Sequence, residues 1–135
     1  MPPTRAAQIL VAEDQTDIRD LLVMNLRTAG YEVSAVGDGE QALARQVEQP
    51  ADLLILDLMM PRRDGFSVLR ELRTDGRIAN LPVIVVTAIF GLSERLYATE
   101  LGAADYVTKP FELDELLERV RNALASRRAE PASSA

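Results

Sequence analysis

The chain has 135 residues, of which 47% are hydrophobic, so its length fits one domain with an ordinary buried core. It contains no cysteine and no histidine, which excludes disulfides, thiolate or imidazole metal sites, cysteine nucleophiles, serine–histidine–aspartate triads and a phosphohistidine within the chain. The formal net charge of −6 is opposite in sign to that of most nucleic-acid-binding domains, so we expect no direct nucleic-acid binding.

Five apolar runs mark the predicted strands in chain order. The runs do not alternate with polar residues, which favours strands covered on both faces, as in a parallel sheet. Strands are therefore expected at residues 9–11, 31–36, 53–56, 83–86 and 106–107.

Stretches with helical periodicity separate these runs. The stretch after the first run ends at Gly30, and the one after the third run ends at Asp75 and Gly76, which are typical helix ends. Ser93 is expected to cap the helix that precedes Gly102. The stripes with helical spacing are Ile18, Leu22, Asn25, Leu26 and Ala29; Phe66, Leu69 and Leu72; and Leu113, Leu116, Leu117, Val120 and Leu124.

The alternation of strands and helices predicts an α/β fold. We expect a doubly wound (βα)5 domain with a five-stranded parallel sheet in the flavodoxin-like order 2-1-3-4-5. Its expected bounds are residues 8–128, with an N-terminal extension at 1–7 and a disordered C-terminal tail at 129–135. In such sheets the ligand site lies beyond the carboxyl ends of the strands, so the residues that follow each strand are the functional candidates.

Three carboxylates follow two of these strands: Glu13 and Asp14 after the first, and Asp57 after the third. Clustered carboxylates repel each other, and Mg²⁺ (or Mn²⁺) relieves that repulsion because it prefers carboxylate, phosphate and water oxygens. Lys109 follows the fifth strand and adds a positive charge, so the metal and the lysine together balance the acids. Such a site suits phosphoryl transfer, with Asp57 as nucleophile and Thr87, after the fourth strand, as hydrogen-bond donor.

Together these motifs resemble the receiver domain of bacterial two-component response regulators. The resemblance covers residues 8–128, and its specificity comes from the order and spacing of the motifs, since each one alone is weak. The motifs are Glu13-Asp14, Asp57-Leu-Met-Met-Pro61 with Gly65, Thr87-Ala88, and Gly102-Ala-Ala-Asp-Tyr106-Val-Thr-Lys109-Pro110-Phe111.

The resemblance implies a role for each matching residue. Asp57 accepts a phosphoryl group from a histidine kinase or phosphotransfer protein, and Lys109, Thr87 and Ala88 bind that group. Thr87 and Tyr106 are the implied switch residues: Thr87 moves to contact the phosphoryl group, and Tyr106 changes rotamer in response. The family also implies a cis peptide between Lys109 and Pro110. The implied Mg²⁺ ligands are Asp14, Asp57 and the Met59 carbonyl directly, and Glu13 through water.

Four positions depart from the commonest pattern of that family. Glu13 stands where an aspartate is common, and Ala104 stands where many members carry one. Met59 and Ile89 flank the phosphorylation site and are both apolar. Apolar side chains offer an attacking water no hydrogen-bond partner, so we expect slow self-dephosphorylation.

The resemblance also implies an output surface, formed by the helix before Gly102, the fifth strand and the last helix. In members with a winged-helix domain this surface forms a two-fold dimer, and the last helix here is similar to theirs. The matching charge pairs are Arg95 with Glu115 and Asp105 with Arg119. We expect tighter pairing after phosphorylation; the alternative is a monomer that uses the same surface for an effector or output domain. Whether the chain stands alone or belongs to a longer regulator is left open.

Three other functions fit these residues less well. The segment Gly37-Asp-Gly39-Glu-Gln-Ala42 is similar to a dinucleotide fingerprint, but its acids would repel a pyrophosphate. A phosphatase of the haloacid dehalogenase type would need a second acid at Met59. A phosphate-independent interaction module leaves the Asp–Thr–Lys set unexplained. We therefore expect no turnover of external substrates. No apolar run approaches the about 20 residues of a membrane span, so we expect no membrane contact. The N-terminus lacks the apolar stretch of a signal peptide and the absence of cysteine fits a reducing compartment, so we expect a cytoplasmic protein.

Overall fold

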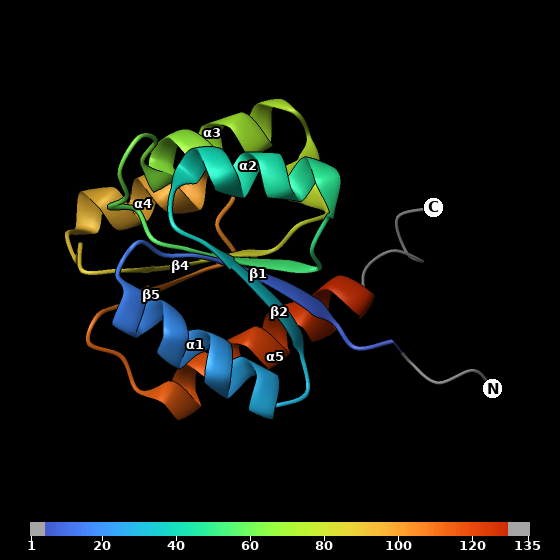
Figure 1. The fold of residues 1–135 in the computed structure, drawn as a ribbon. Coiled ribbons are helices and arrows are strands. Elements are labelled where there is room, and N and C mark those ends of the chain that lie inside the picture. The colour runs from blue at the N-terminus through green and yellow to red at the C-terminus, as the bar shows by residue number, and fades with distance from the viewer. Residues whose placement is uncertain (1–4, 130–135) are drawn as a thin grey trace.

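The computed structural model describes residues 5–129 (Figure 1). Strands and helices alternate along these residues, as the sequence predicts. The strands are β1 (Gln8–Ala12), β2 (Glu32–Val36), β3 (Leu53–Leu56), β4 (Val83–Thr87) and β5 (Asp105–Thr108). The helices are α1 (Thr16–Thr28), α2 (Gly39–Glu48), α3 (Gly65–Thr74), the short 3₁₀ helix η1 (Arg77–Ala79), α4 (Leu92–Glu100) and α5 (Leu113–Ala129).

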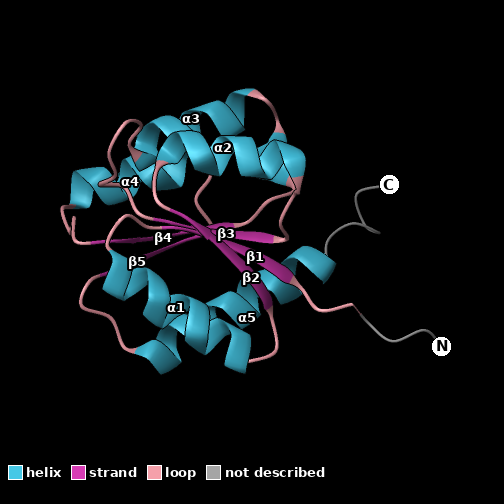
Figure 2. Cartoon of the chain, in the orientation of Figure 1, coloured by secondary structure: helices cyan, strands magenta, loops and turns pink. Residues whose placement is uncertain are grey.

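The five strands form one parallel sheet in the order β2-β1-β3-β4-β5, which confirms the predicted flavodoxin-like topology. Helices α1 and α5 cover one face of the sheet, and α2, α3 and α4 cover the other (Figures 1 and 2). Every crossover therefore returns the chain to the same edge, so the carboxyl ends of all five strands meet there.

The core explains why the strands read as unbroken apolar runs. Along β3, Leu53 and Ile55 pack in the cluster that contains side chains of α1 and α5, whereas Leu54 and Leu56 pack in the cluster beneath α2, α3 and α4. All four side chains are buried, so neither face of the strand has room for a polar residue.

Side-chain caps fix the starts of two helices that border the carboxyl edge. Asp38 accepts a hydrogen bond from Gln41 N at the start of α2, and Asp64 accepts one from Ser67 N at the start of α3. The predicted cap of α4 is wrong. Helix α4 begins at Leu92, after Gly91 in an extended conformation, so Ser93 lies inside the first turn and cannot serve as its cap.

None of the helices among residues 5–129 combines the length and the apolar character that a membrane span needs.

The ends of the chain bear on the expected domain bounds. Helix α5 continues to Ala129, one residue past the expected domain boundary. Residues 1–4 and 130–135, which make up most of the expected extension and tail, lie outside the described residues.

Candidate functional site

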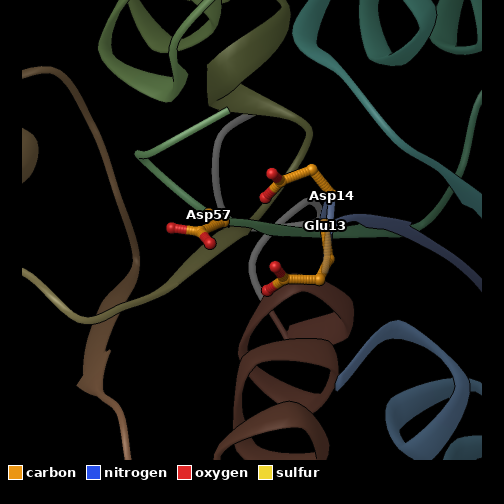
Figure 3. A group of neighbouring side chains, drawn as sticks. All are labelled: Glu13, Asp14 and Asp57. Carbon is orange, nitrogen blue, oxygen red and sulfur yellow. The ribbon is translucent and has the colours of Figure 1, made fainter. Parts of the chain in front are cut away.

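The acidic residues predicted from the sequence converge at the carboxyl edge of the sheet. Strands β1 and β3 are neighbours in register, and Asp57 N donates a hydrogen bond to the carbonyl of Ala12, just before Glu13. One carboxylate oxygen from each of Glu13, Asp14 and Asp57 lies within 4.8 Å of the others. Figure 3 shows these side chains extending from the two strand ends into a common space. Glu13 and Asp57 are buried, whereas Asp14 is exposed.

Lys109 reaches the same site from β5. Its Nζ atom lies 2.8 Å from Glu13 Oε1 and 2.9 Å from Asp57 Oδ2. Its backbone N–H donates to the Thr87 carbonyl, which holds the start of the β5–α5 loop against the end of β4. The peptide between Lys109 and Pro110 is cis, as predicted. Lys109 is also the only lysine in the chain, and a compact ammonium can contact two carboxylates at once.

The charges at this site do not balance. Burial raises the pKa of Glu13; the hydrogen bond from Lys109 opposes that rise, and repulsion from Asp57 adds to it. Burial alone would lower the pKa of Lys109, but its bonds to Glu13 and Asp57 raise it above the ordinary value. The Lys109 ammonium is thus the counterion of two buried carboxylates, and Asp14 adds a third negative charge beside them. Hard oxygen ligands with excess negative charge fit a divalent cation such as Mg²⁺.

The β3–α3 loop (residues 57–64) turns back over the end of β3. Met59 N–H donates to Asp57 Oδ1 over 3.0 Å, and the Met59 side chain is 58% exposed. Gly65 N–H donates to the Leu58 carbonyl, and a Cβ on Gly65 would lie only 2.5 Å from the Asp57 carbonyl oxygen. A glycine is therefore required where α3 begins beside the acidic site.

The predicted switch residues meet at the β4–α4 loop. The buried Thr87 hydroxyl accepts a hydrogen bond of 3.4 Å from Ile89 N–H. The Tyr106 hydroxyl donates to the Ile89 carbonyl over 2.7 Å, and its ring is buried. The Arg95 guanidinium lies 5.7 Å from the centroid of that ring. Ala88, between Thr87 and Ile89, is exposed. Thr87 and Tyr106 thus hold the same backbone segment.

The residues expected at a dimer surface already have partners within the chain. Arg119 Nη1 lies 2.6 Å from Asp105 Oδ1, and Arg119 Nη2 lies 3.6 Å from Glu115 Oε2. If Asp105 or Arg119 contacted a second subunit, that contact would either break the internal Asp105–Arg119 ion pair or form in addition to it.

Sequence reasoning missed three residues near the site. The Gln15 side chain accepts a hydrogen bond of 3.3 Å from Lys109 Nζ, and its backbone N–H donates to Glu13 Oε2. Its position directly after the acidic pair is a signal that could have found it. Asp38 and Arg62 form an ion pair of 2.7 Å. They lie 24 positions apart, and no local pattern links them.

The fold and the site define a flavodoxin-like α/β domain whose acidic residues and lysine lie at the carboxyl edge of the sheet. Residues 9–121 match the family model of the response regulator receiver domain. The chain therefore belongs to the receiver domains of two-component response regulators.

Individual relatives agree with this assignment. The chain is 43% identical over 114 residues to the DNA-binding dual master transcriptional regulator RpaA of Synechocystis sp., covering 84% of this chain and 47% of the relative. It is 42% identical over 130 residues to the response regulator MprA of Mycobacterium bovis, covering 96% of this chain and 55% of the relative. The chain spans about half the length of these curated relatives.

The fold of the chain also matches a solved receiver-domain structure. The receiver domain of the Francisella response regulator 1452 superposes with a TM-score of 0.84 at 31% identity. The match covers 89% of this chain and 98% of that domain.

Proposed function

We propose that Asp57 accepts a phosphoryl group from the phosphohistidine of a histidine kinase or phosphotransfer protein, in a reaction that depends on a divalent cation. The observation that carries this proposal is the position of the Asp57 carboxylate, buried at the end of β3, beside a second buried acid and 2.9 Å from the Lys109 ammonium. These 135 residues contain no histidine, so the phosphohistidine is not one of them.

The proposed transfer forms a bond between an Asp57 carboxylate oxygen and phosphorus while the phosphorus–nitrogen bond of the donor breaks. The electron pair of that bond stays on the imidazole nitrogen of the donor. The product is an acyl phosphate on Asp57. Lys109 then pairs with phosphoryl oxygens, and the Thr87 hydroxyl turns from Ile89 to donate a hydrogen bond to one of them. These groups stabilise charge and orientation, which phosphoryl transfer needs most.

The proposed Mg²⁺ ligands are Asp14, Asp57 and the Met59 carbonyl, with Glu13 acting through water. A bound divalent cation would neutralise charge on the carboxylates and on the incoming phosphoryl oxygens. The excess of carboxylates over ammonium groups at the site supports this assignment. Mn²⁺ has the same preference for oxygen ligands and is expected to substitute.

The proposed output is a change in the surface of α4, β5 and α5, which controls an effector or output domain in the cytoplasm. The hydrogen bond from Tyr106 to the Ile89 carbonyl supports this route, because it joins a β5 side chain to the loop that follows Thr87. Two of the relatives are transcriptional regulators or response regulators about twice as long as this chain, which fits a separate output domain.

Incubation with a small phosphodonor such as acetyl phosphate tests the proposal. In Mg²⁺ the intact protein should gain the mass of one phosphoryl group, and removal of the cation by EDTA should prevent the gain. Steady release of product from an external phosphate ester would instead favour the haloacid-dehalogenase-type phosphatase. No uptake under any condition would favour the phosphate-independent module.

A further inference from the structure

The β3–α3 loop, which carries Met59, is tied to the start of α2 by an ion pair. Arg62 Nη1 lies 2.7 Å from Asp38 Oδ2. The Asp38 carboxylate is buried, and its other oxygen accepts the capping hydrogen bond from Gln41 N–H. The pair therefore joins the loop to a group whose own position is fixed by a helix end.

Arg62 has a backbone conformation that residues with a side chain rarely adopt. Its φ is +67°, and it is the only residue other than glycine with positive φ among residues 5–129. Such a conformation persists when surrounding contacts hold it. The ion pair with Asp38 is a contact of this kind, since Arg62 is otherwise largely exposed.

The loop also lies directly against the first residue of α2. A side chain at Gly39 would collide with the Arg63 carbonyl, so the two segments approach as closely as backbones can. Arg63 adds a weaker link to α2, because its guanidinium lies 4.0 Å from Glu40. Its shorter contact, of 3.1 Å, is with Glu71 in α3. Asp38 and Arg62 are thus the strongest polar link in a contact that fixes where the loop lies.

The position of this loop matters for the cation because Met59 lies three residues before Arg62. We propose that the Asp38–Arg62 ion pair is a positioning device that holds the Met59 carbonyl where it can bind the divalent cation, and so sets the affinity of the site. Neither residue touches the cation. This inference rests on the metal site of the proposed function.

Charge and positioning predict opposite effects of removing Arg62 on Mg²⁺ affinity. Arg62 is positively charged and repels a cation, so its removal should strengthen Mg²⁺ binding if only long-range charge matters. If Arg62 positions the Met59 carbonyl, its removal should weaken Mg²⁺ binding. Residues that orient metal ligands typically change metal affinity by about 10–100-fold. We expect a loss of affinity near the lower end of this range, about tenfold. The reason is that Asp14 and Asp57 are held close to the ends of β1 and β3, and not by the Asp38–Arg62 pair.

The experiment is calorimetric titration of the intact chain with Mg²⁺. Arg62→Gly removes the ion pair and tolerates positive φ, so the variant should stay folded, and Arg62→Asn is a second variant with the same tolerance. Arg70→Ala, on the exposed surface of α3, removes an equal charge without touching the loop. Arg62→Lys keeps the charge and should recover part of the affinity. The double variant with Asp38→Asn should bind no more weakly than Arg62→Gly alone.

A second measurement separates positioning from general stability. Amide hydrogen exchange should speed up at residues 59–63 in Arg62→Gly. The urea midpoint should stay close to that of the wild type, because relief of the positive φ by glycine offsets the loss of an ion pair whose arginine is largely exposed. Unchanged or tighter Mg²⁺ binding by Arg62→Gly, with normal binding by the wild type, would overturn the inference and leave the proposed function intact. Absence of Mg²⁺ binding by the wild type would overturn the metal site and this inference together.

Discussion

Lys109 Nζ lies 2.9 Å from Asp57 Oδ2, although the two residues are 52 positions apart in the sequence. The same nitrogen lies 2.8 Å from Glu13 Oε1. A lysine from the end of β5 is thus the shared counterion of buried carboxylates from β1 and β3. Both the stability of the domain and its proposed chemistry depend on this arrangement.

Replacing Lys109 by methionine should destabilise the domain. The change leaves two buried carboxylates without their cation, and breaking a buried pair costs about 3–5 kcal/mol. We expect the free energy of unfolding, measured by urea unfolding in EDTA, to fall by about 3 kcal/mol. This is the low end of the range, because Asp14 is exposed and water can therefore reach the site. Saturating Mg²⁺ should recover part of the loss. An equal stability of variant and wild type in EDTA would contradict this account.

The same contacts predict the titration of Lys109. Because its folded pKa is raised, its stabilising contribution is fully present below the unfolded pKa of about 10.4 and is lost as pH rises through the folded pKa. Lys109 is the only lysine, so selective ¹⁵N-lysine labelling reports one side chain by NMR. The measured pKa should lie above the ordinary value; a value below it would mean that burial outweighs the carboxylates.

Mg²⁺ should stabilise the domain through Asp14. Binding to the folded state alone adds about 2.7 kcal/mol at a free concentration one hundred times the Kd. In Asp14→Asn this gain should largely disappear, while stability in EDTA should be equal or higher because one repelling charge is gone. Asp17→Asn removes an exposed acid from the first turn of α1 and is the matched control. If both variants respond to Mg²⁺ like the wild type, Asp14 is not a ligand.

Much of this molecule could be predicted from sequence because the informative signals are local. Unbroken apolar runs identify strands such as β3, and the acids that follow them are placed at one edge by topology alone. Ser93 shows the limit, since caps depend on the backbone conformation of Gly91, which composition does not reveal. Asp38 and Arg62 show another, since their pairing depends on how two loops approach in space.

Polar substitution of Met59 should shorten the lifetime of the phosphorylated state. Hydrolysis needs a water in line with the acyl phosphate, and the half-exposed Met59 and partly buried Ile89 give such a water no hydrogen-bond partner. Met59→Asn should speed the decay, which is measured as the loss of the added phosphoryl mass with time after the phosphodonor is removed. Met24→Asn changes a similarly exposed methionine in α1 and should leave the decay rate unchanged. A slower or unchanged decay in Met59→Asn would refute the shielding argument.

Charge reversal tests the dimer surface. If Arg95 of one subunit pairs with Glu115 of the other, each contact occurs twice by symmetry. Exposed pairs contribute about 0.2–1 kcal/mol each, so Arg95→Glu should abolish an already weak dimer. The double variant with Glu115→Arg should restore it. Sedimentation in the presence and absence of beryllofluoride measures the association. A mass that stays monomeric on activation would favour a different protein as partner.

The site of phosphorylation is the most direct test of the central proposal. The chain is incubated with acetyl phosphate and Mg²⁺ and then treated with borohydride, which reduces an acyl phosphate to an alcohol. Peptide mass spectrometry then locates the modified residue. We predict homoserine at position 57 alone, with no modification in Asp57→Asn and normal modification in Asp52→Asn. Modification at another residue, or persistent labelling of Asp57→Asn, would contradict the account.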